Sequence, residues 1–435
     1  GAAGQATGYE IEQSIRFNDN DSAYLTRTPS SAGNRRTFTF SCWVKRANIT
    51  GSNCPILTAG GDEWLMFLSG DTLGFNQDGS NNYRIVTTQL FRDPGAWFHL
   101  VLRVDTTNAT AGDRFRLYIN GAEVTAFGTD TNPPLNYDTA INNTVAHNIG
   151  KTSGSVFFDG YLAEIHHVDG SSLAPTSFGE TNDDGVWIPK RYGGSYGTNG
   201  FYITGATASD LGEDFSGNNN DFTSSGLTTA DQRLATPTLN KATLNVLNLH
   251  TTGSVLSDGN LTVTNSGTSG YWHRSYATQS LSYKTYWEVH ADNLGSLNMG
   301  VSSLGNVPGG VNNPAGNKAA GAQNNEAFVT GSYANEGSGG RTFPISTGNY
   351  VMLAFDPARG ALWMGTEGTW KDGTGSSASS STILSEIVGT GTSYAIFTGI
   401  GTEPVPFVGG YSTNKCTARF SSGDWEGTVP TGYEE

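Results

Sequence analysis

The chain has 435 residues, of which 58 are Gly, 11% are aromatic and only 14% are charged. This aromatic content excludes a disordered chain, and the net charge of −15 excludes a nucleic-acid-binding surface built on bulk basic charge. No apolar run approaches the ~18 residues of a membrane span, so we expect no membrane insertion. A chain of this length predicts more than one domain.

The first part of the chain shows strict alternation of apolar and polar residues. Residues 1–8 are expected to be a flexible start, and strand-length runs follow it. The clearest runs are R-T-F-T-F-S-C-W-V-K (36–45), W-F-H-L-V-L-R-V-D (97–105), R-F-R-L-Y-I-N-G-A-E-V (114–124) and F-D-G-Y-L-A-E-I-H-H-V (158–168). Because alternation of period two buries one face of a strand, these runs predict an antiparallel β-sandwich over residues 9–175.

Residues 176–245 have a different character. Turn formers dominate this segment, and Phe201–Ile203 is its one clear strand. It nevertheless contains aromatic residues such as Trp187 and Phe222, which favour burial. We therefore expect a loop-rich connector that packs on a domain.

Residues 246–435 predict a second β-sandwich. Its best strand runs are Y-W-E-V-H (286–290), Y-V-M-L-A-F-D (350–356), A-L-W-M (361–364), Y-A-I-F (394–397), P-F-V (406–408) and C-T-A-R-F (416–420). Thr382–Val388 is the best helical candidate. The predicted fold class is all-β, with two antiparallel β-sandwich (jelly-roll) domains and a connector between them.

Three cysteines, Cys42, Cys54 and Cys416, are too few for a disulfide framework. We expect reduced, buried thiols and assembly in a reducing cytoplasm. The chain begins at Gly1 without Met and without a basic-then-apolar leader, so we expect either processing or a further segment upstream.

The first sandwich resembles LamG, or concanavalin A-like, domains. The residues that carry this resemblance are F-T-F-S-C-W-V-K (38–45), W-F-H-L-V-L-R-V-D (97–105), L-Y-I-N-G-A-E-V (117–124) and F-F-D-G-Y-L-A-E-I (157–165). The second sandwich is similar to SPRY domains through Y-W-E-V (286–289), M-G-V-S (299–302), Y-V-M-L-A-F-D-P-A-R-G-A-L-W-M-G (350–365) and P-F-V-G-G-Y (406–411).

The connector resembles a segment of LamG-containing structural proteins of tailed bacteriophages. The matching stretches are D-D-G-V-W-I-P-K (183–190), G-T-N-G-F-Y-I-T-G (197–205), L-G-E-D-F-S-G-N-N-N-D-F (211–222) and A-T-P-T-L-N-K-A-T-L-N (235–245). This resemblance implies a virion protein, a tail fibre or receptor-binding component that recognises a host surface glycan or protein. It also implies other virion proteins as partners and a homo-oligomer, by family analogy a trimer. A capsid-decorating or head-fibre protein without receptor activity is the alternative, and a glycan depolymerase is a third hypothesis.

The sequence does not predict an enzyme. A glycosidase needs two carboxylates about 5–10 Å apart, and Glu164 and Glu288 are isolated acids within their runs. The G-x-S-x-G stretch at 193–197 lacks the preceding strand and following helix of a nucleophile elbow. Neighbouring strand residues point to opposite faces, so His166 and His167 are not expected to bind one metal.

Aromatic residues beside amides are the better signal for ligand binding. An aromatic face can stack on a sugar ring while amides donate hydrogen bonds, and this pattern selects Trp64, Asn81, Asn82, Tyr83 and Trp370. The alternative is that Trp64 and Tyr83 are core strand residues. Asp19 and Asp21, in N-D-N-D, are a weak candidate for Ca²⁺, with a plain turn as the alternative; no other cofactor is expected.

Overall fold

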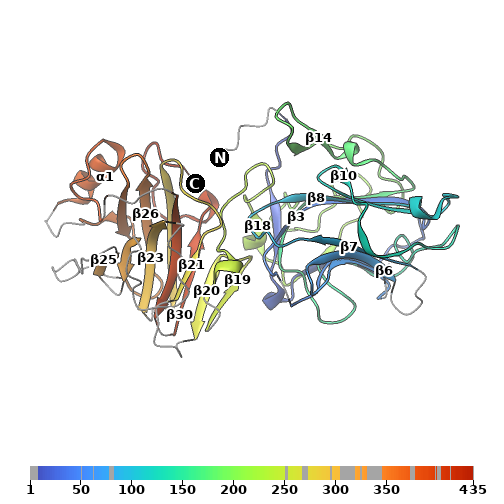
Figure 1. The fold of residues 1–435 in the computed structure, drawn as a ribbon, viewed down its shortest axis with the longest axis horizontal. Coiled ribbons are helices and arrows are strands. Elements are labelled where there is room, and N and C mark those ends of the chain that lie inside the picture. Colours follow the sequence, from blue (N-terminus) through green and yellow to red (C-terminus); the bar gives the residue numbers. More distant parts are fainter. Residues whose placement is uncertain are drawn as a thin grey trace. The chain divides into compact units, whose positions relative to one another are not determined.

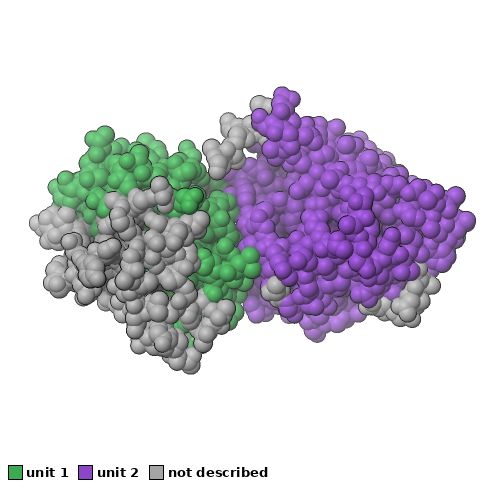
Figure 2. Space-filling model, in the orientation of Figure 1, with its two compact units in different colours: residues 1–2, 241–435 green, residues 3–240 purple. Residues whose placement is uncertain are grey.

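The computed structural model describes residues 8–49, 51–61, 63–77, 83–249, 253–266, 273–293, 296–303, 319–323, 326–330, 345–372, 378–396, 398, 403–411 and 413–434. The chain divides into two compact units (Figure 2). We call residues 3–240 the N-terminal unit and residues 241–435 the C-terminal unit. Each unit is a pair of antiparallel sheets (Figure 1), so the predicted all-β fold with two β-sandwiches is confirmed.

Sheet A of the N-terminal unit has the order β10-β9-β8-β3-β13-β1-β18, and β16 also pairs with β13. Its strands are β1 (Ser14–Phe17), β3 (Thr37–Arg46), β8 (Phe98–Asp105), β9 (Phe115–Ile119), β10 (Ala122–Glu123), β13 (Gly160–Asp169), β16 (Phe201–Ile203) and β18 (Gln232–Arg233). The turn between β9 and β10 has positive φ at Asn120 and Gly121, as the Asn-Gly hairpin signal requires.

Sheet B has the order β11-β7-β6-β5-β4-β12-β2-β17. Its strands are β2 (Tyr24–Arg27), β4 (Cys54–Ala59), β5 (Glu63–Phe67), β6 (Thr72–Gln77), β7 (Arg84–Leu90), β11 (Phe127–Thr131), β12 (His147–Ile149) and β17 (Thr223–Ser225).

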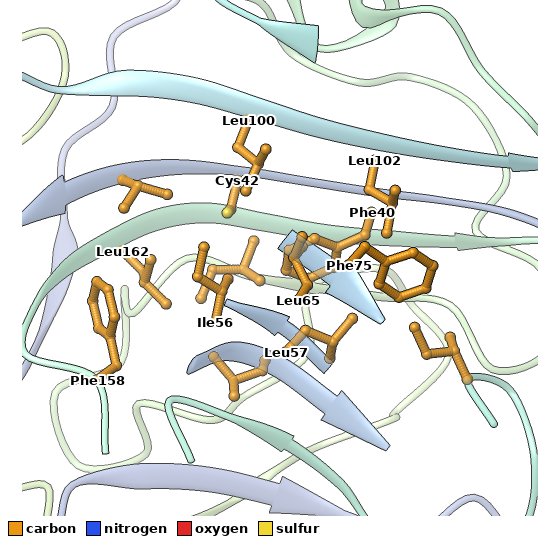
Figure 3. Packing of buried hydrophobic residues seen from close by; sticks show 14 of the residues in the cluster. Phe40, Cys42, Ile56, Leu57, Leu65, Phe75, Leu100, Leu102, Phe158 and Leu162 are labelled. Carbon is orange, nitrogen blue, oxygen red and sulfur yellow. The ribbon is translucent and has the colours of Figure 1, made fainter. Parts of the chain in front are cut away.

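The core of the N-terminal unit lies between sheets A and B. Figure 3 shows side chains of the two sheets meeting there, among them Phe40 and Leu102 from sheet A and Leu57, Leu65 and Phe75 from sheet B. Phe40 and Leu102 occupy inward positions of the alternating runs at 36–45 and 97–105, which is why the period-two pattern predicted them. The two sheets differ in how far their outward-facing residues are covered by other segments.

The connector belongs structurally to the N-terminal unit. Its strands β16 and β18 join sheet A, and β17 joins sheet B beside β2. A further hairpin consists of β14 (Gly179–Thr181) and β15 (Trp187–Pro189). Phe201–Ile203 is therefore one of five short strands in this segment, and the expectation of a single clear strand was wrong. The other strands have two or three residues, too few to show a period.

The C-terminal unit packs a seven-stranded sheet C on a five-stranded sheet D. Sheet C, in spatial order, consists of β19 (Ser254–Ser257), β20 (Thr262–Ser266), β30 (Thr413–Arg419), β22 (Thr285–Asn293), β26 (Tyr350–Asp356), β27 (Ala361–Thr366) and β28 (Thr369–Trp370). Sheet D consists of β21 (His273–Tyr276), β29 (Pro404–Tyr411), β23 (Ser296–Ser303), β24 (Ala319–Gln323) and β25 (Glu326–Thr330).

The helix α1 (Ser380–Val388) covers the outer face of sheet C through Ile383 and Ile387. It confirms the predicted helical candidate and begins two residues earlier, where the Ser379 hydroxyl accepts a hydrogen bond from the Thr382 N–H. The expected strand at 394–397 is wrong over its described residues, Tyr394–Ile396. The Tyr394 N–H instead donates to a carboxylate oxygen of Glu386 on the helix.

Cys42, Cys54 and Cys416 are free and buried, as expected. Burial raises the pKa of each thiol, which makes the thiolate scarce and the residue unreactive. Within the described ranges, no helix is long and apolar enough to cross a membrane.

Candidate functional site

Two of the aromatic residues predicted to bind a ligand lie in the cores of their units. The Tyr83 side chain is fully buried, with its ring edge-on to Phe115 at 4.7 Å between centroids. Trp370 on β28 is 5% exposed and packs in the cluster beneath α1. Such rings offer no face to a sugar, so the structure favours the core alternative for Tyr83 and places Trp370 in a core as well. Asn81 and Asn82 lie outside the described residues.

Asp19 and Asp21 form a short 3₁₀ turn between β1 and β2. The Asn18 amide donates to the Asp21 carboxylate at 2.7 Å, and burial raises the pKa of Asp19 above its ordinary value. Among the described residues no cluster of three or more acidic, His or Cys side chains could hold a metal, so the turn alternative describes this segment better.

The outward-facing positions of sheet B carry a cross-strand row of polar side chains around Trp64, which is buried in its middle and accessible toward its two ends. The register aligns one residue from each of six neighbouring strands β7, β6, β5, β4, β12 and β2, and these are Arg84, Asn76, Trp64, Thr58, Asn148 and Thr26. At about 4.8 Å between neighbouring strands, the row spans about 24 Å. We call it the sheet B row.

Trp64 lies in the middle of the sheet B row. A Cβ at Gly74 would lie 3.1 Å from its ring, so the indole lies across this glycine, and the ring is only 6% exposed. The Arg84 guanidinium lies 5.9 Å from the ring centroid, within cation–π range. Because Arg84 is exposed and Trp64 is not, the indole supports the guanidinium rather than reaching a ligand itself.

A second group of accessible side chains lies at the other end of the sheet B row. The Lys151 ammonium lies 4.2 Å from the ring centroid of Tyr24, and the Phe157 ring lies 6.2 Å from the same ring. All three side chains are half-buried. The Lys151 carbonyl accepts a hydrogen bond from the Thr58 hydroxyl at 2.8 Å, which ties this loop to the row.

Sequence reasoning missed Arg84, Lys151, Tyr24 and Phe157. Tyr24 was detectable, because it lies one position before the inward-facing Leu25 and must therefore point outward. The others depend on strand register and loop placement, which the sequence does not show.

The outer face of sheet A is covered by the N-terminal segment and the connector, whereas part of the outer face of sheet B is accessible. His99 stacks between Trp43 and Trp187, with ring centroids 5.0 and 6.0 Å away. Its Nδ1 accepts from the Trp187 indole at 3.0 Å, so its Nε2 carries the proton and donates to the Ser41 hydroxyl at 2.8 Å. Burial lowers the pKa of His99 to about 3, which keeps the ring neutral.

A β-bulge in β13 places Glu164 beneath the N-terminal segment and the connector, which together overlie this face and which we call the cover. Its φ is 50°, in the left-handed region, and the register with β3 shifts between Ala163 and His166. Both carboxylate oxygens are occupied, because Tyr9 and Tyr202 donate to them at 2.7–3.0 Å. Burial and this carboxylate raise the pKa of Tyr202 and raise that of Tyr9 to about 12.

The two histidines of β13 point to opposite faces, as expected. His166 stacks on Tyr202 at 4.3 Å on the covered outer face, whereas His167 packs on Phe38 and Phe201 toward the core. They therefore cannot share a metal ion. Ser195, the centre of the G-x-S-x-G stretch, lies in an exposed loop without strand or helix.

The Asn-rich connector motif has a structural role. The Asp214 carboxylate accepts from the backbone N–H groups of Tyr202, Ser216 and Asn220, each at 2.8 Å. The side-chain amide of Asn220 in turn donates to the carbonyl of Gly200, at 2.8 Å. These bonds fix the loop on the turn that precedes β16.

A second buried carboxylate anchors this turn to the sandwich. Asp169, at the end of β13, accepts from the Asn34 N–H at 2.7 Å, the Asn142 amide at 3.0 Å and the Asn199 N–H at 3.0 Å. It therefore joins the start of β3, the segment before β12 and the connector.

Comparison with known proteins agrees with the first sandwich. Residues 18–175 match the Laminin_G_3 family model, described as the concanavalin A-like lectin/glucanases superfamily. This match confirms the LamG-like, concanavalin A-like domain that the sequence predicted. A fold of this type is compatible with binding a glycan. A comparison with curated protein sequences found no match.

Several solved structures are similar at low identity. The SPRY domain of human HERC1 is 13% identical, with 39% of this chain and 93% of that chain covered and a TM-score of 0.28. A putative carbohydrate binding protein from Bacteroides ovatus is 14% identical, with 50% and 58% covered and a TM-score of 0.32. A SAP-like pentraxin from Limulus polyphemus is 18% identical, with 38% and 80% covered and a TM-score of 0.27.

Proposed function

We propose that this protein binds a surface glycan, without cleaving it, through the outer face of sheet B. The observation that carries the proposal is the sheet B row, in which polar side chains from five strands flank a Trp and those at the two ends of the row are accessible. Its accessible members, Arg84 at one end and Asn148 and Thr26 at the other, lie up to about 24 Å apart, so an extended oligosaccharide rather than a single sugar would reach both ends. The concanavalin A-like lectin/glucanase match over residues 18–175 supports the same ligand class.

The accessible side chains at the two ends of the row would make different contacts with a glycan. Arg84, supported by Trp64, donates hydrogen bonds to hydroxyl or acidic groups of the glycan at one end. Tyr24 and Phe157 provide aromatic surface at the other end, with Lys151 beside them. The described members of the row include no carboxylate, and a glycosidase needs two. This composition favours binding without hydrolysis over a depolymerase.

We further propose that the protein is a component of a bacteriophage virion, of the tail-fibre or receptor-binding type. This rests on the resemblance of the connector motifs and implies virion partners and a homo-oligomer, with a trimer as the expectation. A capsid-decorating or head-fibre role is the alternative. Immunogold electron microscopy of phage particles would decide the location, and light scattering of the purified chain would give the oligomeric state.

Binding to a glycan array and to whole bacterial cells, with analysis of released sugars, tests the glycan proposal. We expect binding without cleavage, and loss of binding in Arg84→Ala and Tyr24→Ala. Arg103→Ala is the matched control, because Arg103 lies on sheet A and bonds to the Ser172 hydroxyl at 2.7 Å. Released sugar products would favour the depolymerase. Binding that survives both sheet B variants would remove the sheet B row as the site.

A further inference from the structure

A buried lysine lies against a side-chain amide near the end of the connector. Lys45 on β3 is fully buried, and its Nζ donates a hydrogen bond to Oδ1 of Asn240 at 2.9 Å. Tyr161, which lies opposite Lys45 on β13, is also buried, and the Trp97 ring lies 6.2 Å from the Tyr161 ring. The amine is therefore held beside aromatic residues and out of contact with water.

Burial makes this amine a nucleophile. An ammonium has no lone pair to donate, but burial lowers the pKa of Lys45 from 10.5 to about 7, so the neutral amine is well populated at neutral pH. Because the side chain is 0% exposed, an electrophile from solution does not reach it. The amine can react only with a group that it already contacts, and the Asn240 amide is such a group.

The Asn240 amide is held in an orientation that suits this reaction. Its Nδ2 donates to the Gly95 carbonyl at 2.8 Å, so Oδ1 is directed toward Lys45 and Nδ2 away from it. Because a carbonyl bond is about 1.2 Å long, Nζ lies within about 4.1 Å of Cγ, and reacting atoms need to approach to about 3–3.5 Å. Asn240 is exposed, so ammonia released from Nδ2 would leave into solvent.

Asp93 provides a carboxylate on the turn that holds the amide. Its Oδ1 accepts from the Gly95 N–H at 2.8 Å, and the carbonyl of the same glycine accepts from Asn240. The negative charge of Asp93 also acts on Lys45. A carboxylate in this position can take a proton from the attacking amine and return it to the departing one, directly or through one water.

We propose that Lys45 and Asn240 form an intramolecular isopeptide bond. The Nζ–Cγ bond forms and the Cγ–Nδ2 bond breaks, while Asp93 takes one proton from Nζ and delivers it to Nδ2, which leaves as ammonia. The step consumes no oxidant or cofactor, and Asp93 ends as a carboxylate. The bond would join β3 covalently to the end of the connector and fasten the cover of sheet A. The proposal concerns sheet A and is independent of glycan binding on sheet B.

Intact-mass spectrometry of the full chain tests the proposal. After incubation above pH 7, we expect the wild-type mass to be lower than the sequence mass by one ammonia, and the full sequence mass in Asn240→Ala. Tryptic digestion should release one species that joins residues 37–46 to residues 234–241, because trypsin does not cleave after an acylated lysine. Asp93→Asn should slow the loss of ammonia about a hundredfold.

Asn218→Ala is the matched control for Asn240→Ala. Asn218 is also an exposed connector residue, but its amide donates to the carbonyls of Gly197 and Gly200, so this variant should still lose ammonia. An unchanged wild-type mass or the absence of the joined peptides would overturn the proposal. Loss of ammonia that persists in Asn240→Ala would also overturn it, because the loss would then come from another residue. An unchanged rate in Asp93→Asn would overturn the role given to that carboxylate.

Discussion

Sheets A and B of the N-terminal unit share one core but differ in what lies on their outer faces. Every residue of β13 on sheet A is buried, because the N-terminal segment and the connector cover it. On sheet B the central strands β4 and β5 are also buried at every residue, but the edge strand β11 and its neighbour β7 are largely exposed. The difference shows that the sequence of a strand does not by itself determine whether its outer face is accessible. A segment distant in sequence decides which face remains accessible.

The largest expected effect comes from removing the cover. A chain cut after residue 175 keeps every run that matches the family model but exposes the outer face of sheet A, including Trp43, Val101 and Val168. We expect it to be insoluble or unfolded, whereas residues 1–240 fold, because an exposed apolar face of this size favours aggregation. Circular dichroism and size-exclusion chromatography of the two truncated chains measure this. A folded, monomeric 1–175 chain would show that the cover is dispensable.

The next effect concerns the carboxylate that anchors the cover. Asp169→Ala leaves the N–H donors of Asn34, Asn142 and Asn199 without their buried acceptor. We expect the free energy of unfolding to fall by about 3 kcal/mol or more. Urea denaturation followed by Trp fluorescence measures the loss. Asp138→Ala, which removes an exposed partner of Arg36, is the control and should change stability by about 0.5 kcal/mol or less.

The pH dependence of stability tests whether the cover buries Lys45. Lys45 lies on the outer face of sheet A, donates to the Asn240 amide at 2.9 Å, and burial lowers its pKa from 10.5 to about 7. Between these values the unfolded chain holds more protons, so the free energy of unfolding should rise as pH increases from about 7 to 10.5. We expect Lys45→Met to remove this rise, which is about 3 kcal/mol between pH 7 and 9.5 in chains whose Lys45 amine is free. Unfolding midpoints in urea at pH 7 and 9.5 measure it; an unchanged slope in the variant would contradict the burial of Lys45.

Glu63, which does not lie under the cover, provides the opposite pH dependence. Burial raises its pKa from 4.5 to about 7, against the N–H donors of Ala140 and Ile141. The folded chain holds more protons between these values, so the free energy of unfolding should fall as pH rises from 4.5 to about 7. Glu63→Gln should flatten this range, measured by urea midpoints at pH 5 and 7. It should leave the rise above pH 7 intact, and loss of both slopes would mean that the two groups are coupled.

The smallest effect on stability is expected on the open face of sheet B. Arg84→Ala should change the free energy of unfolding by about 0.5 kcal/mol or less, because the side chain is exposed. Thermal melts of Arg84→Ala and Arg103→Ala compare the two faces directly, and the half-buried Arg103 should be the more costly loss. The reverse order would mean that sheet B, rather than sheet A, depends on its outer face.

The sequence predicted the parts of the fold that repeat with a period. The strands β3, β8, β9 and β13 have ten residues or fewer, yet the alternation of the runs that contain them was sufficient to identify the first sandwich. The run at 394–397 has apolar character without alternation, and hydrogen bonds to Glu386 hold its first residue in a turn. The short connector strands have no period to detect.

The candidate site was much less predictable. Trp64 was selected for its neighbours in sequence, but the row around it comes from six strands between Thr26 and Asn148, and only their register brings these residues together. Tyr83 and Trp370 were selected as loop aromatics and lie in cores, because burial depends on elements that pack on them from elsewhere.

The position of β1 has a consequence for biosynthesis. This strand, within the first 17 residues, pairs with β13 on one side and with β18, at residues 232–233, on the other. The ribosome must therefore add more than two hundred residues before the first strand has both neighbours, which takes on the order of ten seconds or more. During that time its edge can pair with other chains. In a crowded cell, nascent copies of this protein would therefore expose an unpaired strand edge until the connector has been synthesised.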